Sequence, residues 1–365
     1  MRVRTHLRWI ATAGAAALLV SGCSVDSGGS SEGGAAAGAA SPAANCAIAT
    51  AADPGNSQPA DDTPIAENAP KLAQKDTYRV AFSQNANNGA WRIAETQSMQ
   101  DEAKRLGYQI QVTDAQNNQS KQIQDIRSLI AQKPDALFVA PMTEEIGTVI
   151  GEAKADGIPV FLIDRTVSDS QAKAGTDYVT TIVSDFVQEG KRAAYALAKA
   201  TGGTGKVIAL EGTTGSSSAV DRKKGFEDAL KECPGLELVA TQDADNQRAR
   251  AQDITESLLQ ANPDVTAVYA QGDDMAMGAI AAIRAAGKVP GKDILVVSGD
   301  GSKEALQAIV DGTMAANVEC NPRFGPKAFE IMKQYAAGDD VPTKILNEDR
   351  LFDASNAAEF VNQAY

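Results

Sequence analysis

Histidine is almost missing from this sequence. The one histidine among the 365 residues is His6, which lies in the N-terminal segment that ends at Cys23. Without histidine elsewhere, Ser-His-Asp and Cys-His nucleophile systems and histidine-ligated metal sites are excluded. Cysteine is also scarce: after Cys23 come Cys46, Cys233 and Cys320, whose spacings match no zinc pattern. These three permit at most one disulfide, and the sequence leaves its pairing open.

Basic residues are in the minority in this sequence. The 47 acidic and 34 basic residues give a formal net charge of −13. Such an acidic surface argues against nucleic acid as a partner and against electrostatic adhesion to anionic lipid. The 365 residues are nevertheless enough for one large or two medium domains with real cores.

The first 23 residues are typical of an exported protein. Three arginines precede the apolar run 10–20, and small residues follow it up to Cys23. This arrangement describes a secretory signal peptide, and the run is too short to span a bilayer, which needs about 20 apolar residues. The four residues ending at Cys23 resemble a bacterial lipobox. We therefore expect a signal peptide over 1–22 and lipid on Cys23, which would anchor an extracytoplasmic protein to the bacterial cell membrane. The alternative is ordinary secretion with a chance cysteine at the cut.

Between Ser24 and about Lys75 the sequence is mostly Gly, Ala, Ser, Pro and Asp, with almost nothing large to bury. Such a segment cannot offset the entropy that it would lose on ordering, so it predicts a lipidated flexible linker over 23–75. About 50 residues of this kind span about 40 Å r.m.s.. The alternative, a small ordered domain, lacks any hydrophobic periodicity to support it.

From Thr77 onward, short β-rich runs alternate with longer segments of helical period. Strands that alternate with helices of about 10–15 residues are typical of βαβ units and parallel sheets. The expected strands are more than a single sheet usually holds, and residues 199–205 look like the point where the alternation of strands and helices begins again. The predicted fold class is α/β, with two doubly wound parallel-sheet domains. The expected strands are 78–83, 108–113, 136–140, 159–163, 206–210, 236–241, 267–270 and 294–298, and the expected helices are 90–106, 119–132, 143–155, 185–200, 219–231, 248–261, 275–286 and 303–310.

Polar side chains follow the predicted strands where each strand ends. Ligands of open parallel sheets bind outside the carboxyl ends of the strands, so these positions test for a site without any motif. The opposite ends read mainly as turns, such as 157–159 and 233–235. The asymmetry predicts a ligand cleft between two domains. The polar positions include Ser83, Gln84, Trp91, Arg92, Asp164, Arg165, Thr213, Thr214, the stretch Asp243–Asn246, Asp273, Asp274 and Asp300.

The mixture of arginines and aspartates indicates the chemistry of the ligand. Together they donate to and accept from hydroxyl groups, each of which does both. Balanced charges suit a neutral polyol better than an anion. Trp91 offers the flat apolar face that covers the C–H side of a sugar ring, although it could instead be a core aromatic at a helix start. Asp164 and Arg165 could likewise form a local surface ion pair.

Three other motifs do not complete a site. Residues 202–206 hint at a phosphate loop, but Val207 stands where Ser or Thr should be. Residues 215–218 do not form a nucleophile elbow and have no histidine to activate a serine. Asp273 and Asp274 could bind a cation, yet no loop with calcium-ligand spacing surrounds them. No cofactor and no metal are therefore predicted.

Seven short segments give the chain a family resemblance between about residue 77 and residue 365. In their order and spacing they resemble the type I periplasmic sugar-binding proteins of ABC importers, of the ribose-binding class, and within it the galactofuranose-binding proteins. The resemblance implies a periplasmic binding protein type I fold with a three-strand hinge. The segments are 82–84, 89–92, 94–96, 161–165, 221–226, 273–275 and 299–301.

The resemblance also implies roles for individual residues. Trp91 would stack on the sugar, and the other residues would bond its hydroxyls. Many relatives have an aromatic residue at the position of Asn246 and an asparagine at that of Gly272, so these departures leave the sugar open. The implied ligand residues are Trp91, Arg92, Asp164 and Arg165 from the first lobe, and Arg222, Asn246, Asp273, Asp300 and Glu319 from or beside the second.

The implied chain crossings lie near 183–184, 320–321 and 346–350. They divide the chain into an N-terminal sugar-binding lobe, 76–183 plus 321–347, and a C-terminal sugar-binding lobe, 184–320 plus 348–365. The expected function is that of a monomeric, lipid-anchored substrate-binding protein, not an enzyme. It would close on a galactofuranose-like or ribose-like monosaccharide and present it to an ABC permease. The alternatives are a sugar-sensing receptor module and an exported carbohydrate-active enzyme that uses Asp164 and Asp300 as acid and base.

Overall fold

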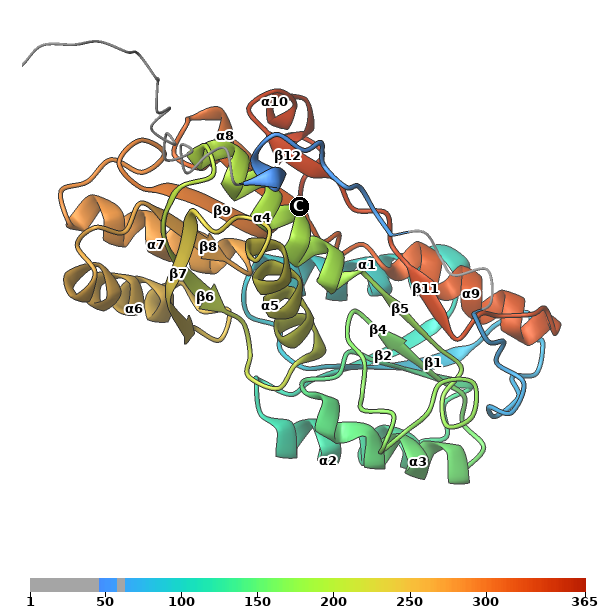
Figure 1. Cartoon of the computed structure of the whole chain (residues 1–365). Helices are drawn as coiled ribbons and strands as arrows, with labels where there is room; N and C mark the ends of the chain where they lie inside the picture. Colours follow the sequence, from blue (N-terminus) through green and yellow to red (C-terminus); the bar gives the residue numbers. More distant parts are fainter. Residues whose placement is uncertain (1–45, 58–62) are drawn as a thin grey trace, which may run out of the picture. The chain divides into compact units, whose positions relative to one another are not determined.

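The computed structural model describes residues 46–57 and 63–365, which form two sheets with helices on their faces (Figure 1). The first sheet has the order β11 (Lys344–Leu346), β5 (Thr180–Val183), β4 (Val160–Ile163), β3 (Ala136–Val139), β1 (Arg79–Gln84), β2 (Gln109–Asp114). The second has the order β12 (Leu351–Asp353), β10 (Ala316–Glu319), β9 (Leu295–Asp300), β8 (Ala267–Ala270), β6 (Gly205–Glu211), β7 (Leu236–Asp243).

The two sheets have equivalent topologies. Read along each sheet, β1 corresponds to β6, β2 to β7, β3 to β8, β4 to β9 and β5 to β10. Neighbouring strands run parallel, apart from the antiparallel pair β10 and β12. The chain enters the second sheet after β5, returns to the first at β11 and ends in the second with β12. The predicted α/β fold with two doubly wound parallel sheets is confirmed.

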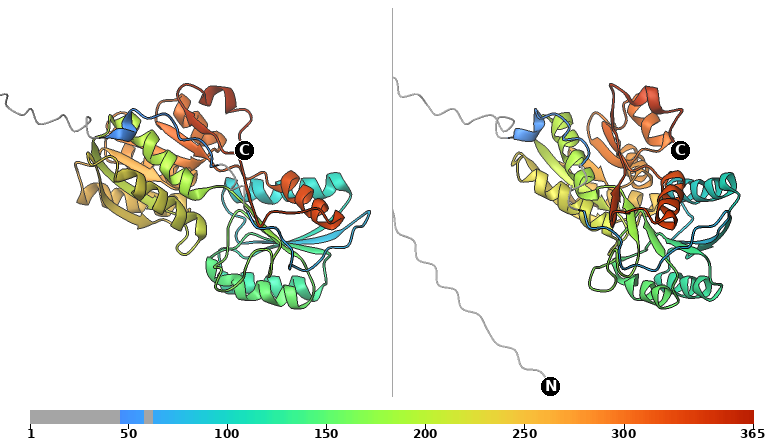
Figure 2. Two further views of the ribbon diagram at one scale, coloured as in Figure 1. Left: turned by 45° about the vertical axis from the view of Figure 1, so that its right-hand side comes forward. Right: turned by 90° about the vertical axis from the view of Figure 1, so that its right-hand side faces the viewer.

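Helices cover both faces of each sheet (Figure 2). Around the first sheet, α1 (Ala90–Leu106) and α9 (Gly325–Ala337) pack together on one face, and α2 (Gln119–Ala131) and α3 (Gly147–Ala155) on the other. Around the second sheet, α4 (Phe186–Thr201) packs with α5 (Ser217–Leu230), α6 (Arg248–Ala261) with α7 (Asp273–Ala285), and α8 (Lys303–Val310) with α10 (Ala357–Phe360). Two 3-10 turns cover Ala47–Ala49 and Glu144–Ile146.

Burial on both faces explains why the strands read as continuous apolar runs. Phe138 of β3 and Phe161 of β4 lie in the core beneath α1 and α9, whereas Leu137 and Leu162 lie in the core above α2 and α3. Successive side chains of a strand point to opposite faces, so a parallel strand needs apolar residues at every position. The strands that the sequence did not predict are β5, β10, β11 and β12, each of three or four residues.

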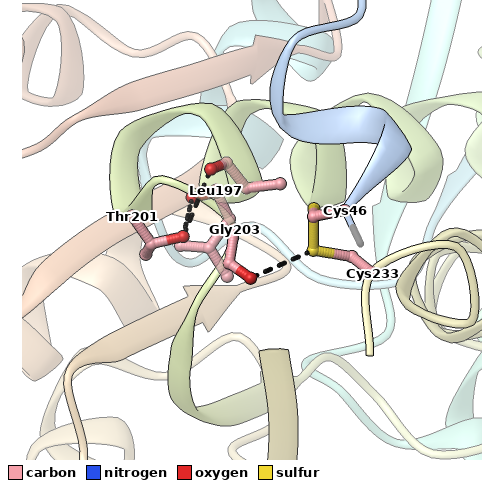
Figure 3. Close-up of a disulfide and its surroundings, with 6 residues drawn as sticks. Cys46, Leu197, Thr201, Gly203 and Cys233 are labelled. Carbon is pink, nitrogen blue, oxygen red and sulfur yellow. Dashed lines mark hydrogen bonds between the residues drawn. A yellow bond between two sulfur atoms is a disulfide. The ribbon is translucent and has the colours of Figure 1, made fainter. Parts of the chain in front are cut away.

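The expectation of a flexible linker is wrong for residues 46–57 and 63–75. Cys46 forms a disulfide with Cys233, and both residues are buried (Figure 3). Gly203 makes room for it, because a Cβ there would lie 2.6 Å from the Cβ of Cys46. Closing a loop across 187 residues contributes about 5 kcal/mol in the chain-entropy account of disulfides. Further along, Leu72 is buried in the core of the first sheet.

The predicted signal peptide and Cys23 lie outside the described residues. Within residues 46–57 and 63–365, no helix is both long and apolar enough to cross a membrane.

Candidate functional site

A cavity lies at the carboxyl ends of both sheets, where the sequence predicted a ligand cleft. Seven of the nine predicted ligand residues line it, and they come from both halves of the chain. Residues of the first sheet and its helices are here called the first half, and those of the second sheet and its helices the second half. The seven are Trp91, Arg92, Asp164, Arg165, Arg222, Asn246 and Asp300.

In the first half, Arg92 lies between two buried carboxylates. Its Nη2 donates to Asp164 Oδ2 at 2.6 Å, and its Nη1 donates to Glu95 Oε2 at 2.7 Å. Glu95 is one turn further along α1, while Asp164 comes directly after the last residue of β4. Although burial acts to lower the pKa of Arg92, the two carboxylates raise it above its ordinary value. The guanidinium therefore stays charged and is fixed in orientation.

Glu95 holds the Arg92 guanidinium in this orientation from a position inside the protein core. It is completely buried, and Gln84 Nε2 donates to its Oε2 at 2.9 Å, while its Oε1 has no hydrogen-bond partner. Burial raises the pKa of Glu95 to about 7, against the opposing charge of Arg92. Glu95 is a positioning residue that sequence reasoning missed, because it sits in a helix interior rather than at a strand end.

Trp91 combines both roles that the sequence left open. The Arg92 guanidinium lies over the Trp91 ring, with its Cζ atom 4.5 Å from the ring centre, and the ring also lines the cavity. The same ring packs edge-on against Phe324 of the core, and its Nε1 donates to the carbonyl of Cys320 at 2.7 Å. With the indole N–H engaged, the ring face is what Trp91 can offer a ligand. The helix that carries Trp91 begins after Gly89, where a Cβ would lie 2.9 Å from Asp274 Oδ2.

Arg165 is a buried guanidinium with unused donors. Its Nη1 donates to the carbonyl of Met142 at 3.1 Å, and its Nε lies 3.4 Å from Asp164 Oδ2 without a hydrogen bond. Burial, together with the charge of Arg92, lowers the pKa of Arg165 to about 10. A polar ligand in the cavity would give this side chain acceptors that the protein does not supply.

The second half repeats the arginine arrangement. Arg222 Nε donates to Glu189 Oε2 at 2.6 Å, its Nη1 to the carbonyl of Gln271 at 2.8 Å, and its Nη2 to Asp300 Oδ1 at 3.3 Å. The guanidinium lies over the ring of Phe186. Burial raises the pKa of Glu189 to about 8, with Arg222 opposing. Its Oε1, like that of Glu95, has no hydrogen-bond partner.

Both aspartates have left-handed backbone conformations at equivalent strand ends. The φ angle is 68° at Asp164, after β4, and 108° at Asp300, at the end of β9. Such values cost energy for a residue with a Cβ and persist where the surrounding structure requires them. They are found here at the two aspartates that contact the two arginines.

The structure does not bring Asp273 and Glu319 to the cavity. Asp273, in the first turn of α7, accepts from Ser298 Oγ at 2.7 Å and from the backbone N–H of Ser302 at 2.7 Å. Burial, with the nearby charge of Asp300, raises the pKa of Asp273 to about 7. Glu319 forms an ion pair with Arg350 at 2.7 Å. Both carboxylates are committed to neighbouring elements, so their prediction as ligand residues is corrected.

Sequence reasoning also missed several residues of the cavity wall, among them Asn85, Asn117 and Gln271, and it placed Asp245 in the polar stretch 243–246 without naming it as a ligand residue. A sequence signal for Asn117 and Asp245 exists. Residues 114–117 read Asp-Ala-Gln-Asn at the end of β2, and residues 243–246 read Asp-Ala-Asp-Asn at the end of β7. We call these the twin loops. The third and fourth residues of each have φ angles of 54–59°, and Asn117 Nδ2 donates across the cavity mouth to Asp245 Oδ2 at 2.9 Å.

The chemistry of the cavity is that of hydroxyl recognition. Three arginines and several carboxylates face it together with amide side chains and one indole ring. Among the described residues, no group of three or more His, Cys, Asp and Glu side chains could hold a metal ion. The arrangement can hold a polyhydroxylated molecule through many charge-assisted hydrogen bonds.

Comparisons with known proteins agree with this geometry. The family model of the periplasmic binding protein domain matches residues 80–340. The galactofuranose-binding protein YtfQ of Escherichia coli (strain K12) is 38% identical over 286 residues, which cover 77% of this chain and 89% of that protein. The ribose import binding protein RbsB of Bacillus subtilis (strain 168) is 36% identical, over 74% of this chain and 86% of its own.

Solved structures give the same result. The crystal structure of a galactofuranose binding protein matches with a TM-score of 0.75 at 37% identity, covering 79% of this chain and 97% of that one. A protein from Mycobacterium smegmatis in complex with β-D-fucofuranose matches with a TM-score of 0.74 at 37% identity, covering 78% and 94%. These relatives are binding proteins rather than enzymes, and the resemblance inferred from the sequence is confirmed. The chain therefore belongs to the periplasmic binding protein family.

Proposed function

We propose that this protein is the lipid-anchored receptor of a carbohydrate ABC importer, and that it captures one monosaccharide in its furanose form. The observation that carries the proposal is the pair of arginines, Arg92 and Arg222, which face one cavity from opposite halves. Each is held between an aspartate at a strand end and a buried glutamate. The furanose form is supported by relatives that are named for galactofuranose or were solved with fucofuranose.

Fixed donors and acceptors on both halves suit a ring with hydroxyls around its edge. Arg165 contributes unused donors, and Asp164 contributes Oδ1, for which no protein donor lies within hydrogen-bond distance among the described contacts. The face of Trp91 covers apolar C–H groups. Because these groups are already oriented by their neighbours, little side-chain entropy is lost when a sugar binds.

Capture would proceed by closure of the halves about the three chain crossings. We assign residues 76–183 plus 321–347 to one lobe and 184–320 plus 348–365 to the other, which agrees with the sheets that their strands join. The halves already touch beside the cavity. The Glu144 N–H donates to the Gly215 carbonyl, and the Thr166 N–H to Ser217 Oγ, each at 3.0 Å. A sugar that bridges the halves would add its own contacts to these and stabilise the closed state.

Calorimetry against D-galactose, D-fucose, L-arabinose and D-ribose tests this proposal. We expect at least one of them to bind, and Trp91→Ala to weaken that binding by about tenfold without unfolding the protein. Trp91→Phe should give an intermediate loss, because it keeps a flat face but not the bond to Cys320. Absence of binding by any furanose-forming sugar, with a folded protein, would count decisively against the site.

Delivery to a membrane permease is supported by the lipobox-like sequence and by relatives named as import binding proteins. A disulfide between Cys46 and Cys233 also suits an oxidising, extracytoplasmic compartment. Labelling of cells with a clickable fatty acid should mark the wild type and not Cys23→Ser. Equal labelling of both, or of neither, would argue for ordinary secretion.

A further inference from the structure

Two stretches that precede the family domain, residues 46–57 and 63–72, are here called the N-terminal strap. They lie before residue 80, where the family match begins. The match to the crystal structure of a galactofuranose binding protein covers 97% of that chain but only 79% of this one. About a fifth of this chain is therefore not matched there. The strap is therefore a feature to explain apart from the shared fold.

The first stretch of the strap is anchored on the second half. Cys46 is joined covalently to Cys233, and Ile48 is 1% exposed in the core beside α4. Both carboxylate oxygens of Asp53 accept from the Arg192 guanidinium at 2.8 Å. The Arg192 side chain is 4% exposed, so Asp53 supplies the charge partner of a buried cation.

The second stretch is anchored on the first half. The Ala66 N–H donates to the Val341 carbonyl at 2.9 Å, and the Pro64 carbonyl accepts from the Thr343 N–H at 2.8 Å. Val341 and Thr343 lie between α9 and β11, which belong to the first half. Leu72 completes the anchor by packing in the core beneath α1 and α9.

The strap also touches the point where the chain crossings meet. Asp349 is 3% exposed; its carboxylate accepts from the Asn321 N–H at 3.2 Å, and burial raises the pKa of this carboxyl while the Ser184 side chain acts to lower it. Ser184, Asn321 and Asp349 belong to the first, second and third crossing. Asn56 of the strap accepts from the Asp349 N–H at 3.1 Å, and Arg192, which Asp53 holds, donates to the Asp349 carbonyl at 2.7 Å.

Covalent geometry limits how far the two anchors can separate. Ser57 and Thr63 are six residues apart in the sequence, so their Cα atoms can never be more than about 22 Å apart. Their neighbours are fixed to opposite halves. Any opening or twisting of the halves about the crossings therefore acts on this connection.

We propose that the N-terminal strap is a fourth connection between the halves, which narrows the range of open arrangements available without ligand. A narrower range lowers the cost of closing, so the strap raises the affinity for the ligand. The restraint on opening stands on the contacts alone, whereas the gain in affinity rests on the proposed function.

Small-angle X-ray scattering of the ligand-free mature protein tests the restraint. Three variants are compared: the double variant Cys46→Ala/Cys233→Ala, the single variant Asp53→Ala and the single variant Asn56→Ala. The fold of each is checked by circular dichroism. The control is Lys75→Ala, which removes an ion pair to Asp135 that lies within the first half. We expect a larger radius of gyration in the strap variants and no change in the control. Folded wild-type protein treated with a phosphine reductant replaces the double variant if that variant fails to fold. Scattering identical to the wild type, in folded protein that lacks the disulfide, would overturn the restraint.

Titration with D-galactose and L-arabinose tests the gain in affinity. We expect the strap variants to bind each sugar about fivefold more weakly, with an unchanged ratio between the two sugars. Wider opening with unchanged affinity would overturn the link to affinity. Wider opening in variants of a protein that binds neither sugar would support the restraint and contradict the proposed function, so the two failures are distinguishable.

Discussion

The two halves of the site are built on equivalent positions, but they differ in the residue next to each aspartate. Arg92 is on the helix after β1 and meets an aspartate directly after β4; Arg222 is on the helix after β6 and meets an aspartate at the end of β9. In the order of the sheets these strands correspond. Each half thus places one arginine between a strand-end aspartate and a buried glutamate.

Beyond this shared arrangement, the halves diverge in charge. The residue after Asp164 is Arg165, a second buried guanidinium, whereas the residue after Asp300 is Gly301, which has a φ angle of 83°. The aromatic ring beside the first arginine, Trp91, lines the cavity, whereas Phe186 in the second half is buried. The equivalent part orients the arginines, and the divergent part sets what a ligand meets in each half.

Removal of either central arginine should have the largest effect. In Arg222→Ala at pH 9, which is above the pKa of about 8 of Glu189, the ionised and buried glutamate loses its charge partner, so we expect a loss of about 3–5 kcal/mol in the free energy of unfolding. Binding should weaken by more than about 100-fold, because charge-assisted hydrogen bonds and the orientation of Asp300 are lost together. Urea unfolding and calorimetry measure the two effects.

A second substitution separates folding from binding in the same experiment. Arg222→Ala combined with Glu189→Gln should recover most of the stability and leave binding lost, because the buried glutamate charge is gone and Asp300 keeps the hydrogen bond from the Asp273 N–H. Arg92→Ala with Glu95→Gln should behave in the same way. If one pair is dispensable for binding and the other is not, the equivalence of the halves is broken.

Arg165→Ala tests the divergent part. We expect binding to weaken by about 10- to 100-fold, since hydrogen bonds to a charged group contribute about 1.5–3 kcal/mol. The free energy of unfolding should change by less than about 1 kcal/mol, because this guanidinium has few protein acceptors to lose. Arg127→Ala, which removes an exposed ion pair to Glu152 in the same half, is the control and should leave binding unchanged. Unchanged affinity in Arg165→Ala would mean that the extra charge does not reach the ligand.

The sequence could reveal Arg92, Arg165 and the aspartates because parallel sheets place strand ends at one edge, whereas only the family resemblance pointed to Arg222, which lies inside α5. It could not show which of two adjacent acids faces the cavity. Asp273 and Asp274 are both in the first turn of α7, yet Asp274 lines the cavity and Asp273 turns toward Ser298. Successive side chains of a helix point about 100° apart, so a shift of one position decides whether a side chain faces the cavity or the protein interior. The interior partner of Asp273, Ser298, is distant in the sequence, so the sequence does not show this choice.

The positioning glutamates and the strap were hidden for a related reason. Glu189 stands in an ordinary helical pattern, and its role depends on Arg222, which is 33 residues away along the chain. The strap has the composition of a disordered segment, and its order comes from single long-range contacts, the disulfide of Cys46 and the ion pair of Asp53. Composition measures how much apolar area a segment can bury and says little about such contacts.

The twin loops give a comparison with a built-in control. Asn117 crosses the cavity mouth to Asp245, while its neighbour Gln116 occupies the place in its loop that Asp245 holds in the other. One such hydrogen bond contributes about 0.5–1.5 kcal/mol, so Asn117→Ala should speed ligand release by about fivefold. Gln116→Ala should leave release unchanged, because both positions have similar left-handed backbones and only Asn117 makes the bond. Stopped-flow fluorescence of Trp91 measures both rates, and equal rates in the two variants would show that the bond does not hold the closed state.

The last comparison is the dependence of stability on pH, which sets the two glutamates directly against each other. Burial raises the pKa of Glu95 from 4.5 to about 7 and that of Glu189 from 4.5 to about 8. Burial is the largest cause of both pKa shifts. The negative charges of Asp349 and Asp300 add to it at Glu189, and the charge of Asp164 adds to it at Glu95. At a pH between 4.5 and the raised pKa of the folded state, the glutamate of the unfolded chain has released its proton, whereas that of the folded chain keeps it. Stability from each group is therefore full below pH 4.5 and is lost as the pH rises through its folded pKa, by at most about 1.4 kcal/mol per pH unit.

Urea unfolding of the wild type and of each glutamine variant between pH 5 and 9, in steps of about one unit, isolates these contributions. Glu95→Gln should remove a decline in stability that ends near pH 7, and Glu189→Gln one that ends near pH 8. Subtraction from the wild-type curve cancels the exposed carboxylates, which titrate below this range. A difference curve that is flat for one variant would mean that its glutamate stays ionised beside its arginine throughout, and that the two halves balance buried charge in different ways.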